Sequence, residues 1–128
     1  MEKKNKMTKL TYLHKFDIII MFKNLNKGVN LMATREIHSS LRGGTGIVVT
    51  HTTKVCGLTF VRLDLRAEST IGEHLHTSDS EIYFTFSRHI RFCNNQKWKL
   101  WNLCSKGSAH SAANLSKNKI ARIWAVKF

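Results

Sequence analysis

From Arg42 onward, the sequence is a series of short runs rich in β-branched and aromatic residues, with turn-forming residues between them. Each run has the length of a strand, and no segment shows the apolar periodicity of a helix of three turns. The runs are GIVVTHTT, LTFVRLDL, EIYFTF, RFC, KWKLW, HSAAN and IARIWAV. About seven short strands at this spacing predict an all-β fold, either a sandwich or a barrel.

Some segments carry more specific expectations. RFC and KWKLW are expected to pair as a hairpin across the NNQ turn at residues 94–96, since asparagine favours tight turns. The segment from Met32 to Leu41 is compatible with a short helix or with an extended lead-in. Trp98, Trp101 and Trp124 are expected to pack inside the barrel rather than to form a stacking platform.

The length of 128 residues allows one domain with a sizeable core but not two. Residues 1–30 are rich in lysine and asparagine and have weak periodicity, so we expect a basic, flexible arm there, or one with an edge strand around residues 17–22. The folded domain is expected at residues 31–128. The apolar run at residues 18–22 is too short for a signal-peptide core or a membrane span, which favours a soluble, cytoplasmic protein.

Cysteine usage agrees with that compartment. Cys56, Cys93 and Cys104 are odd in number and have no CxxC spacing, so they indicate neither a disulfide framework nor a zinc knuckle. Free thiols in a reducing cytoplasm are the simplest interpretation. Cys104 is expected to be a small buried apolar residue.

The formal net charge is +13, and after Glu81 the chain has nine lysines and arginines but no carboxylate side chain. Such an imbalance is typical of proteins that bind nucleic acids or anionic surfaces, but a solvated basic surface gives the same pattern. The sequence contains no basic helix, no nucleic-acid-binding motif and no aromatic residues clustered at readout spacing. Nucleic-acid binding is therefore the least favoured of the candidate functions.

The stretch GEHLHTSDSE at residues 72–81 contains candidate metal ligands. Side chains two positions apart on a strand point to the same face, so His74 and His76 are expected side by side. Glu81 lies five positions past His76, an odd step that would put it on the opposite face of a continuous strand. The polar loop at residues 77–80 can reset the register and return Glu81 to the histidine face. Two imidazoles and one carboxylate form part of a site that suits Mn, Fe, Ni, Co, Cu or Zn.

A fourth ligand has to come from a distant strand, and His110 is the candidate. The glycine turn SKGS places His110 at the start of the HSAAN strand, with Asn114 on the same side. Tyr83, two positions past Glu81, is expected to line the same interior as core filling. The other histidines have no partner at ligand spacing and are expected at ordinary surface or core positions: His14, His38, His51 and His89.

These two segments resemble the two sequence motifs of the cupin superfamily. GEHLHTSDSE is similar to the first motif, with its HxHxxxxE pattern at His74, His76 and Glu81. GSAHSAAN is similar to the second motif, with its GxxHxxxN pattern at residues 107–114. The phrases RGGTGIVV and LTFVRLDLRAESTIGEH also resemble small single-domain cupins, so the likeness covers roughly residues 42–128.

The resemblance implies a jelly-roll β-barrel, usually a homodimer, whose lumen holds a divalent metal ion (Mn, Fe, Ni, Zn, Co or Cu) on His74, His76, Glu81 and His110. It implies a small metalloenzyme of the dioxygenase, isomerase or decarboxylase type, acting on a small oxygenated substrate. A cupin that binds a small ligand or a metal without turnover is the alternative, because the sequence shows no separate general acid and base pair. A basic nucleic-acid-associated protein comes last, and no membrane association is expected.

At several turns the sequence departs from the cupin pattern. The usual Pro-Gly pair before the first motif is Ala67-Glu68, and four other glycine or proline positions hold Arg88, Ile90, Gln96 and Ser105. Such positions need a positive φ, which glycine adopts freely, or a preset φ, which proline supplies. Each loss is expected to lower the stability by about 1 kcal/mol.

Overall fold

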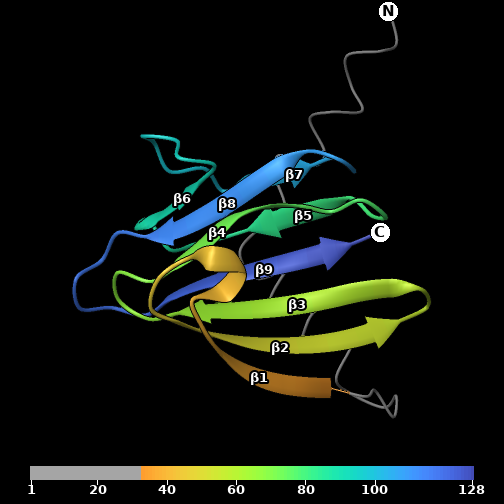
Figure 1. Ribbon diagram of the computed structural model, residues 1–128, viewed down its shortest axis with the longest axis horizontal. Helices are drawn as coiled ribbons and strands as arrows, with labels where there is room; N and C mark the ends of the chain where they lie inside the picture. Colours follow the sequence, from red (N-terminus) through yellow and green to blue (C-terminus); the bar gives the residue numbers. More distant parts are fainter. Residues whose placement is uncertain (1–32) are drawn as a thin grey trace, which may run out of the picture. The chain divides into compact units, whose positions relative to one another are not determined.

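The computed structural model describes residues 33–128, which form nine strands and one 3-10 turn in two antiparallel sheets (Figure 1). The elements are β1 (Ala33–Ser39), η1 (Leu41–Gly43), β2 (Ile47–Val55), β3 (Leu58–Leu65), β4 (Thr70–Leu75), β5 (Glu81–Phe84), β6 (Ile90–Phe92), β7 (Trp101–Cys104), β8 (Ala109–Asn114) and β9 (Ala121–Lys127). The prediction of an all-β fold is confirmed. The predicted N-terminal arm at residues 1–30 lies outside the described residues, so the domain boundary stays a prediction.

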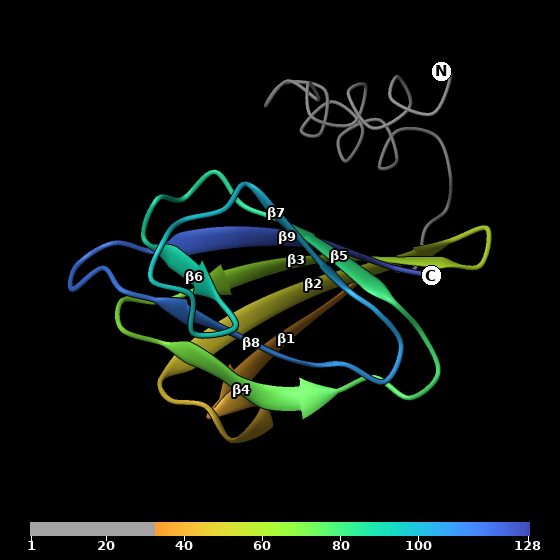
Figure 2. The same cartoon turned by 90° about the horizontal axis from the view of Figure 1, so that it is seen from above.

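The larger sheet has the strand order β1-β2-β3-β9-β5-β7, and the smaller sheet has the order β4-β8-β6. Figure 2 shows β4 and β8 on one side of the layer that contains β9 and β3. The buried core draws on both sheets, with Leu63 and Ile123 from the larger one and Ile71 and Phe92 from the smaller one. The core therefore lies between the sheets, as expected when each sheet has one apolar face.

Two strands were not among the predicted runs. The segment at residues 33–39 is extended rather than helical, because β1 pairs with β2 along its whole length, from Ala33 opposite Thr53 to Ser39 opposite Ile47. The second added strand, β4, contains the first histidine of the GEHLHTSDSE stretch. Among residues 33–128, no helix has the length and hydropathy needed to cross a membrane.

The predicted hairpin between RFC and KWKLW is wrong. β6 pairs with β8 in the smaller sheet, where Phe92 lies opposite Ala112, while β7 pairs with β5 in the larger sheet. The chain leaves β6 through two residues with positive φ, Cys93 (52°) and Asn94 (56°), and β7 begins only at Trp101. The connection passes from one sheet to the other, so the two strands belong to different layers and cannot form a hairpin.

Two of the three tryptophans do not pack inside the barrel, contrary to expectation. Trp101 has an exposed fraction of 44%, and Trp124 is half-buried. Trp98 is also half-buried, with its indole Nε1 buried. In β9, Trp124 lies between the fully buried residues Ile123 and Ala125. Successive side chains of a strand point to opposite faces, so Trp124 faces away from the core.

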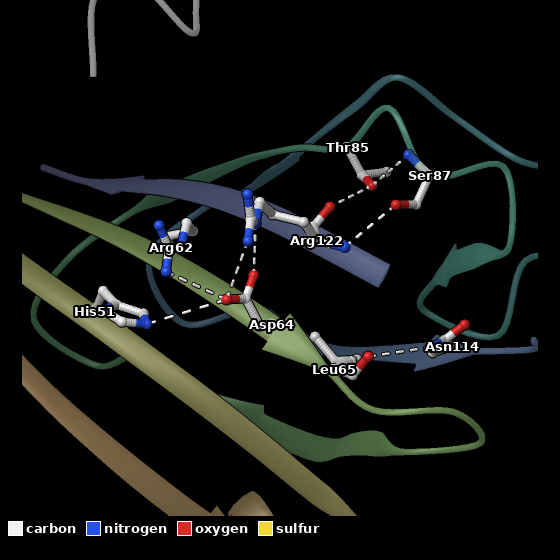
Figure 3. Close-up of polar contacts among 8 residues, drawn as sticks. All are labelled: His51, Arg62, Asp64, Leu65, Thr85, Ser87, Asn114 and Arg122. Atoms are coloured by element: carbon white, nitrogen blue, oxygen red, sulfur yellow. Dashed lines mark hydrogen bonds and ion pairs between the residues drawn. The ribbon is translucent and has the colours of Figure 1, made fainter. Parts of the chain in front are cut away.

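Asp64 of β3 also lies on the outer face of the larger sheet, in an ion-pair network (Figure 3). Arg122 donates from Nε to Oδ1 of Asp64 at 2.6 Å and from Nη2 to Oδ2 at 3.3 Å. Nη2 of Arg62 lies 3.3 Å from Oδ2, and the His51 ring lies 4.0 Å from it. Asp64 therefore serves cross-strand pairing on the outer face.

Asn114, the last residue of the second motif, is a structural residue. Its side chain is 2% exposed, and its Nδ2 donates to the carbonyl oxygens of Leu65 (3.2 Å; Figure 3), Arg66 (3.1 Å) and Lys119 (2.8 Å). Its Oδ1 accepts from the N–H of Ser116 at 3.0 Å. One buried amide thus joins the end of β3 to the loop that leads into β9.

The expected strain from missing glycines is present at Glu68, in the turn that joins β3 to β4. Glu68 stands where the cupin pattern has glycine, and its φ is 59°. A non-glycine residue in this left-handed region costs about 1–2 kcal/mol, because its Cβ crowds the following carbonyl oxygen. At the other departing glycine positions φ is not positive, so the backbone strain predicted there is absent: Arg88, Ile90 and Gln96. The cost expected at Ser105, which stands at a proline position, stays a prediction.

We expect Glu68→Gly to raise the free energy of unfolding by about 1 kcal/mol, because glycine adopts a positive φ without the Cβ clash. Equilibrium urea denaturation of the full chain measures the change. Ala67→Gly is the matched control: φ of Ala67 is negative, so glycine there only adds entropy to the unfolded chain and should lower the stability. An equal effect of the two substitutions would contradict the interpretation.

Candidate metal centre

His74 and His110 lie opposite each other on β4 and β8, the paired strands of the smaller sheet. Their ring centroids are 4.2 Å apart. The pairing has a register irregularity between Ile71 and His74, and both of these side chains line the same interior cavity. Residues three apart on a regular strand would point to opposite faces, so this irregularity brings His74 into the lumen.

His76 follows the end of β4, and its ring stacks on that of His110 with the centroids 4.8 Å apart and an interplanar angle of 8°. Glu81 is the first residue of β5 in the larger sheet and is 3% exposed. The prediction that the loop at residues 77–80 returns Glu81 to the histidine face of the same sheet is wrong. It carries the chain to the other sheet, so Glu81 approaches the histidines from across the lumen.

The four residues singled out in the sequence therefore meet. Oε2 of Glu81 lies 2.9 Å from Nε2 of His76 and 3.4 Å from Nε2 of His110. One ligand atom from each of His74, His76 and His110 lies within 4.8 Å of the others, a cluster that can hold a metal ion. Adjacent ligands of a metal bound at about 2.1 Å in octahedral geometry are about 3 Å apart, which matches the Glu81 distances.

The imidazole nitrogens also fit a metal. Nε2 of His76 and Nε2 of His110 are buried and have no hydrogen-bond partner among residues 33–128. Buried polar atoms normally have a hydrogen-bond partner. These two nitrogens lie close to the Glu81 carboxylate, so the three groups are well placed to bind one cation together. The assignment of the four side chains as ligands stays a prediction.

A hydrogen bond outside the cluster orients the His74 ring. Its Nδ1 donates to the carbonyl oxygen of Gly72 at 2.8 Å, which leaves Nε2 for the lumen, as is usual for metal-binding histidines. Nδ1 of His76 lies 3.2 Å from Oδ1 of Asp79, a charge contact without the geometry of a hydrogen bond. Asp79 was missed in the sequence. Its position three residues after His76, in the same polar loop, was the available signal.

Tyr83 lines the lumen as expected, and it also makes a specific contact. Its hydroxyl donates to Oε2 of Glu81 at 2.7 Å, and its side chain is buried. Burial and the neighbouring Glu81 carboxylate raise the pKa of the Tyr83 hydroxyl well above its ordinary value. Tyr83 therefore remains a protonated donor that fixes the orientation of the carboxylate.

The surroundings keep two of the imidazoles neutral. Burial lowers the pKa of His76, and the nearby Lys127 lowers it further. Burial lowers the pKa of His110 as well, with a further contribution from His74. The neutral imidazole is the form that binds metals.

The cluster opens into a cavity of about 220 Å³. Its wall combines threonine hydroxyls, apolar side chains and charged groups: Glu36, His38, Leu41, Arg42, Thr50, Thr52, Thr59, Val61, Leu63, Ile71, His74, His76, Glu81, Tyr83 and Lys127. His38 was expected at an ordinary position, yet it lines this cavity and its Nε2 lies 2.9 Å from Oγ1 of Thr50. That outcome could not be predicted, because it depends on the pairing of β1 with β2 in the larger sheet.

A close backbone contact brings Arg42 to the cavity. η1 lies against β4 so tightly that a Cβ on Gly72 would overlap the carbonyl oxygen of Arg42. A Cβ on Gly44 would overlap the carbonyl oxygen of Thr70. Glycine is required at both positions, and the contact holds the 3-10 turn over the lumen.

The chain matches no protein-family model and no curated protein. Solved structures do match. A predicted oxalate decarboxylase from Thermotoga maritima has a TM-score of 0.63 and 24% identity, over 76% of this chain and 93% of that one. An RmlC-like cupin from Shewanella frigidimarina has a TM-score of 0.52 and 11% identity, over 73% and 83% of the two chains. The fold is that of a cupin.

The jelly-roll prediction and the resemblance to cupins are thereby confirmed at the level of the fold. AerE from Microcystis aeruginosa also matches, with a TM-score of 0.58 and 11% identity, although this chain spans 47% of it. The cupin architecture accounts for the meeting of the two motifs, since it brings β4, β5 and β8 around one lumen.

We expect Asp79→Asn to weaken binding of a divalent metal roughly 10- to 100-fold, because the amide removes the negative charge that lies beside Nδ1 of His76. Competition against a metal-binding dye measures the affinity. Asp64→Asn is the matched control, since Asp64 lies on the outer face and its loss should leave the metal affinity unchanged. Equal weakening by both substitutions would count against a positioning role for Asp79.

Proposed function

We propose that this cupin binds a divalent metal ion in its lumen and acts on a small oxygenated anion held beside it. The observation that carries the proposal is the convergence of His74, His76, His110 and the buried Glu81 carboxylate. When bound, a divalent metal supplies Lewis acidity or redox chemistry to an oxygen donor of the ligand. Which metal is bound is left open by these donors, because imidazole and carboxylate suit several transition metals.

The protein residues supply orientation. The Gly72 carbonyl holds the His74 ring by its Nδ1, and Tyr83 holds the carboxylate of Glu81. The Asp79 carboxylate lies beside Nδ1 of His76. Apolar side chains on the cavity wall, such as Val61 and Leu63, exclude water from this side of the lumen. A preorganised and partly dry site strengthens the interactions of a polar ligand with the groups around it.

Two cations favour an anionic ligand. Arg42 and Lys127 line the same cavity as His74 and His76. Burial lowers the pKa of His76, and the charges of Lys127 and Arg42 lower it further. Glu36 also lines the cavity, but it lies 3.6 Å from His38 and its side chain is 65% exposed. A small carboxylate with further oxygen donors fits this combination of charge, hydroxyl groups and volume. The name of the Thermotoga maritima protein, a predicted oxalate decarboxylase, agrees with such a ligand.

The proposal has two forms, an enzyme and a binding module without catalytic activity, and a measurement of turnover distinguishes them. An enzyme would convert the anion, whereas a binding module would retain it unchanged. A cytoplasmic location and a homodimer remain part of the proposal. They rest on the thiol content and on the resemblance to cupins.

Elemental analysis of the purified full chain tests the metal site. We expect one divalent ion per chain in the wild type, and its loss in His74→Ala and in His110→Ala, since each removes a ligand. His89→Ala is the control, because His89 is exposed and lies outside the cluster. Circular dichroism checks that each variant is folded. Metal content that is unaffected by the two ligand substitutions would refute the site.

Calorimetric titration tests the anion. We expect malonate to bind the metal-loaded protein, and Arg42→Gln or Lys127→Gln to weaken that binding about tenfold, because each removes a charge-assisted contact. Lys54→Gln is the control on an exposed lysine outside the cavity. Neutral malonamide should bind less tightly than malonate. Equal binding of the two compounds would refute the anionic ligand and leave the metal site standing.

A further inference from the structure

Two of the three cysteines meet where the edges of the two sheets approach each other. Cys104 ends β7, the edge strand of the larger sheet, and Cys93 directly follows β6, the edge strand of the smaller one. Nδ2 of Asn102 contacts both sulfurs, at 3.4 Å for Cys104 and 3.7 Å for Cys93. The shared amide nitrogen places the two sulfurs close together, although the sequence spacing gave no reason to expect a pair. Burial and the neighbouring Cys93 thiol raise the pKa of the Cys104 thiol to about 12.

The two thiols differ in access. Cys93 is exposed, whereas Cys104 is 5% exposed. The backbone N–H of Cys93 donates to the carbonyl oxygen of Ser111 at 2.9 Å, which holds the turn after β6 against β8. An incoming oxidant can reach Cys93 first, and Cys104 is then the closest thiol to the modified sulfur. Cys56, which is also exposed, lies in the turn between β2 and β3.

We propose that Cys93 and Cys104 are a redox-active pair that closes to an intramolecular disulfide in the presence of a low-molecular-weight disulfide such as oxidised glutathione. The Cys93 thiolate attacks one sulfur of the oxidant, forms a mixed disulfide and releases one glutathione, which takes up the proton that Cys93 lost. Cys104 then loses its proton and attacks the sulfur of Cys93, and the second glutathione leaves with a proton. The protein loses two electrons and two protons, and one oxidised glutathione becomes two reduced molecules.

The disulfide has a structural consequence. It covalently joins the turn after β6 to β7, and thus one sheet edge to the other. Cys104 is also the register partner of Glu81 on β5, so the bond fastens the strand next to the carboxylate of the candidate metal centre. The proposal itself stands on the positions of the sulfurs and does not depend on metal binding.

The experiment incubates the full-length reduced protein in glutathione buffers of increasing oxidised fraction. Acid quenching, alkylation with N-ethylmaleimide and mass spectrometry with peptide mapping then locate each thiol. We expect the Cys93–Cys104 disulfide to exceed the glutathione adduct on Cys56 about tenfold at intermediate ratios, because its second step is intramolecular. Alkylation of all three cysteines at every ratio, or equal adducts on Cys93 and Cys56 with Cys104 still reduced, would overturn the proposal.

Single substitutions separate the two steps. Cys56→Ser should close the same disulfide at the same glutathione ratio. Cys104→Ser should accumulate the adduct on Cys93, because no second thiol displaces it. Cys93→Ser should leave Cys104 reduced, because the thiol that reacts first is absent. Since Cys93 is exposed, this variant tests the proposal even if substitution of the buried Cys104 prevents folding. Oxidation of Cys104 in Cys93→Ser at the wild-type ratio would contradict the assigned order.

Discussion

Burial of the Glu81 carboxylate is the constraint on which the rest of the lumen depends. A carboxylate that is 3% exposed is costly unless hydrogen bonds or opposite charges compensate for the lost water. Tyr83 donates to it, whereas the Nε2 atoms of His76 and His110 face it without a hydrogen bond. These groups come from β5, from the end of β4 and from β8, so the arrangement depends on the relative positions of both sheets. A shared cation would satisfy the carboxylate and the imidazole nitrogens together.

The same geometry links the site to the packing of the backbone. His74 faces the lumen because the β4–β8 pairing is irregular just before it, and Gly72 at that point also accepts the hydrogen bond from its ring. Gly72 lets η1 approach β4, which places Arg42 at the cavity. The backbone around Gly72 thus affects the orientation of the His74 ring, the irregularity in the β4–β8 pairing and the position of the Arg42 side chain. For this reason, changes at Gly72 would alter the site without touching a ligand atom.

The connections are less regular than the strands. Six non-glycine residues in the described part of the chain have positive φ: Ser40, Arg42, Cys56, Glu68, Cys93 and Asn94. Glu68 is the one among them at a turn position where the cupin pattern supplies glycine. The apolar side chains packed between the sheets, together with hubs such as Asn114, hold these turns in place. The cupin arrangement therefore persists where turn residues are unfavourable, because the core and the buried amide determine where the strands lie.

The sequence alone determined the all-β character, because strand-length runs and the absence of helical periodicity are local properties. It also indicated the residues that gather in the lumen, because His74, His76, Glu81 and His110 stand at the positions of two motifs that resemble those of cupins. Tertiary structure decided which strands pair. For this reason β6 and β7 belong to different sheets, and Glu81 approaches the histidines from across the lumen. It also decided the roles of Asp79 and His38 and the meeting of Cys93 with Cys104. Such contacts join residues whose separation along the chain carries no periodic signal, and they exist only once the two sheets have closed on a common core.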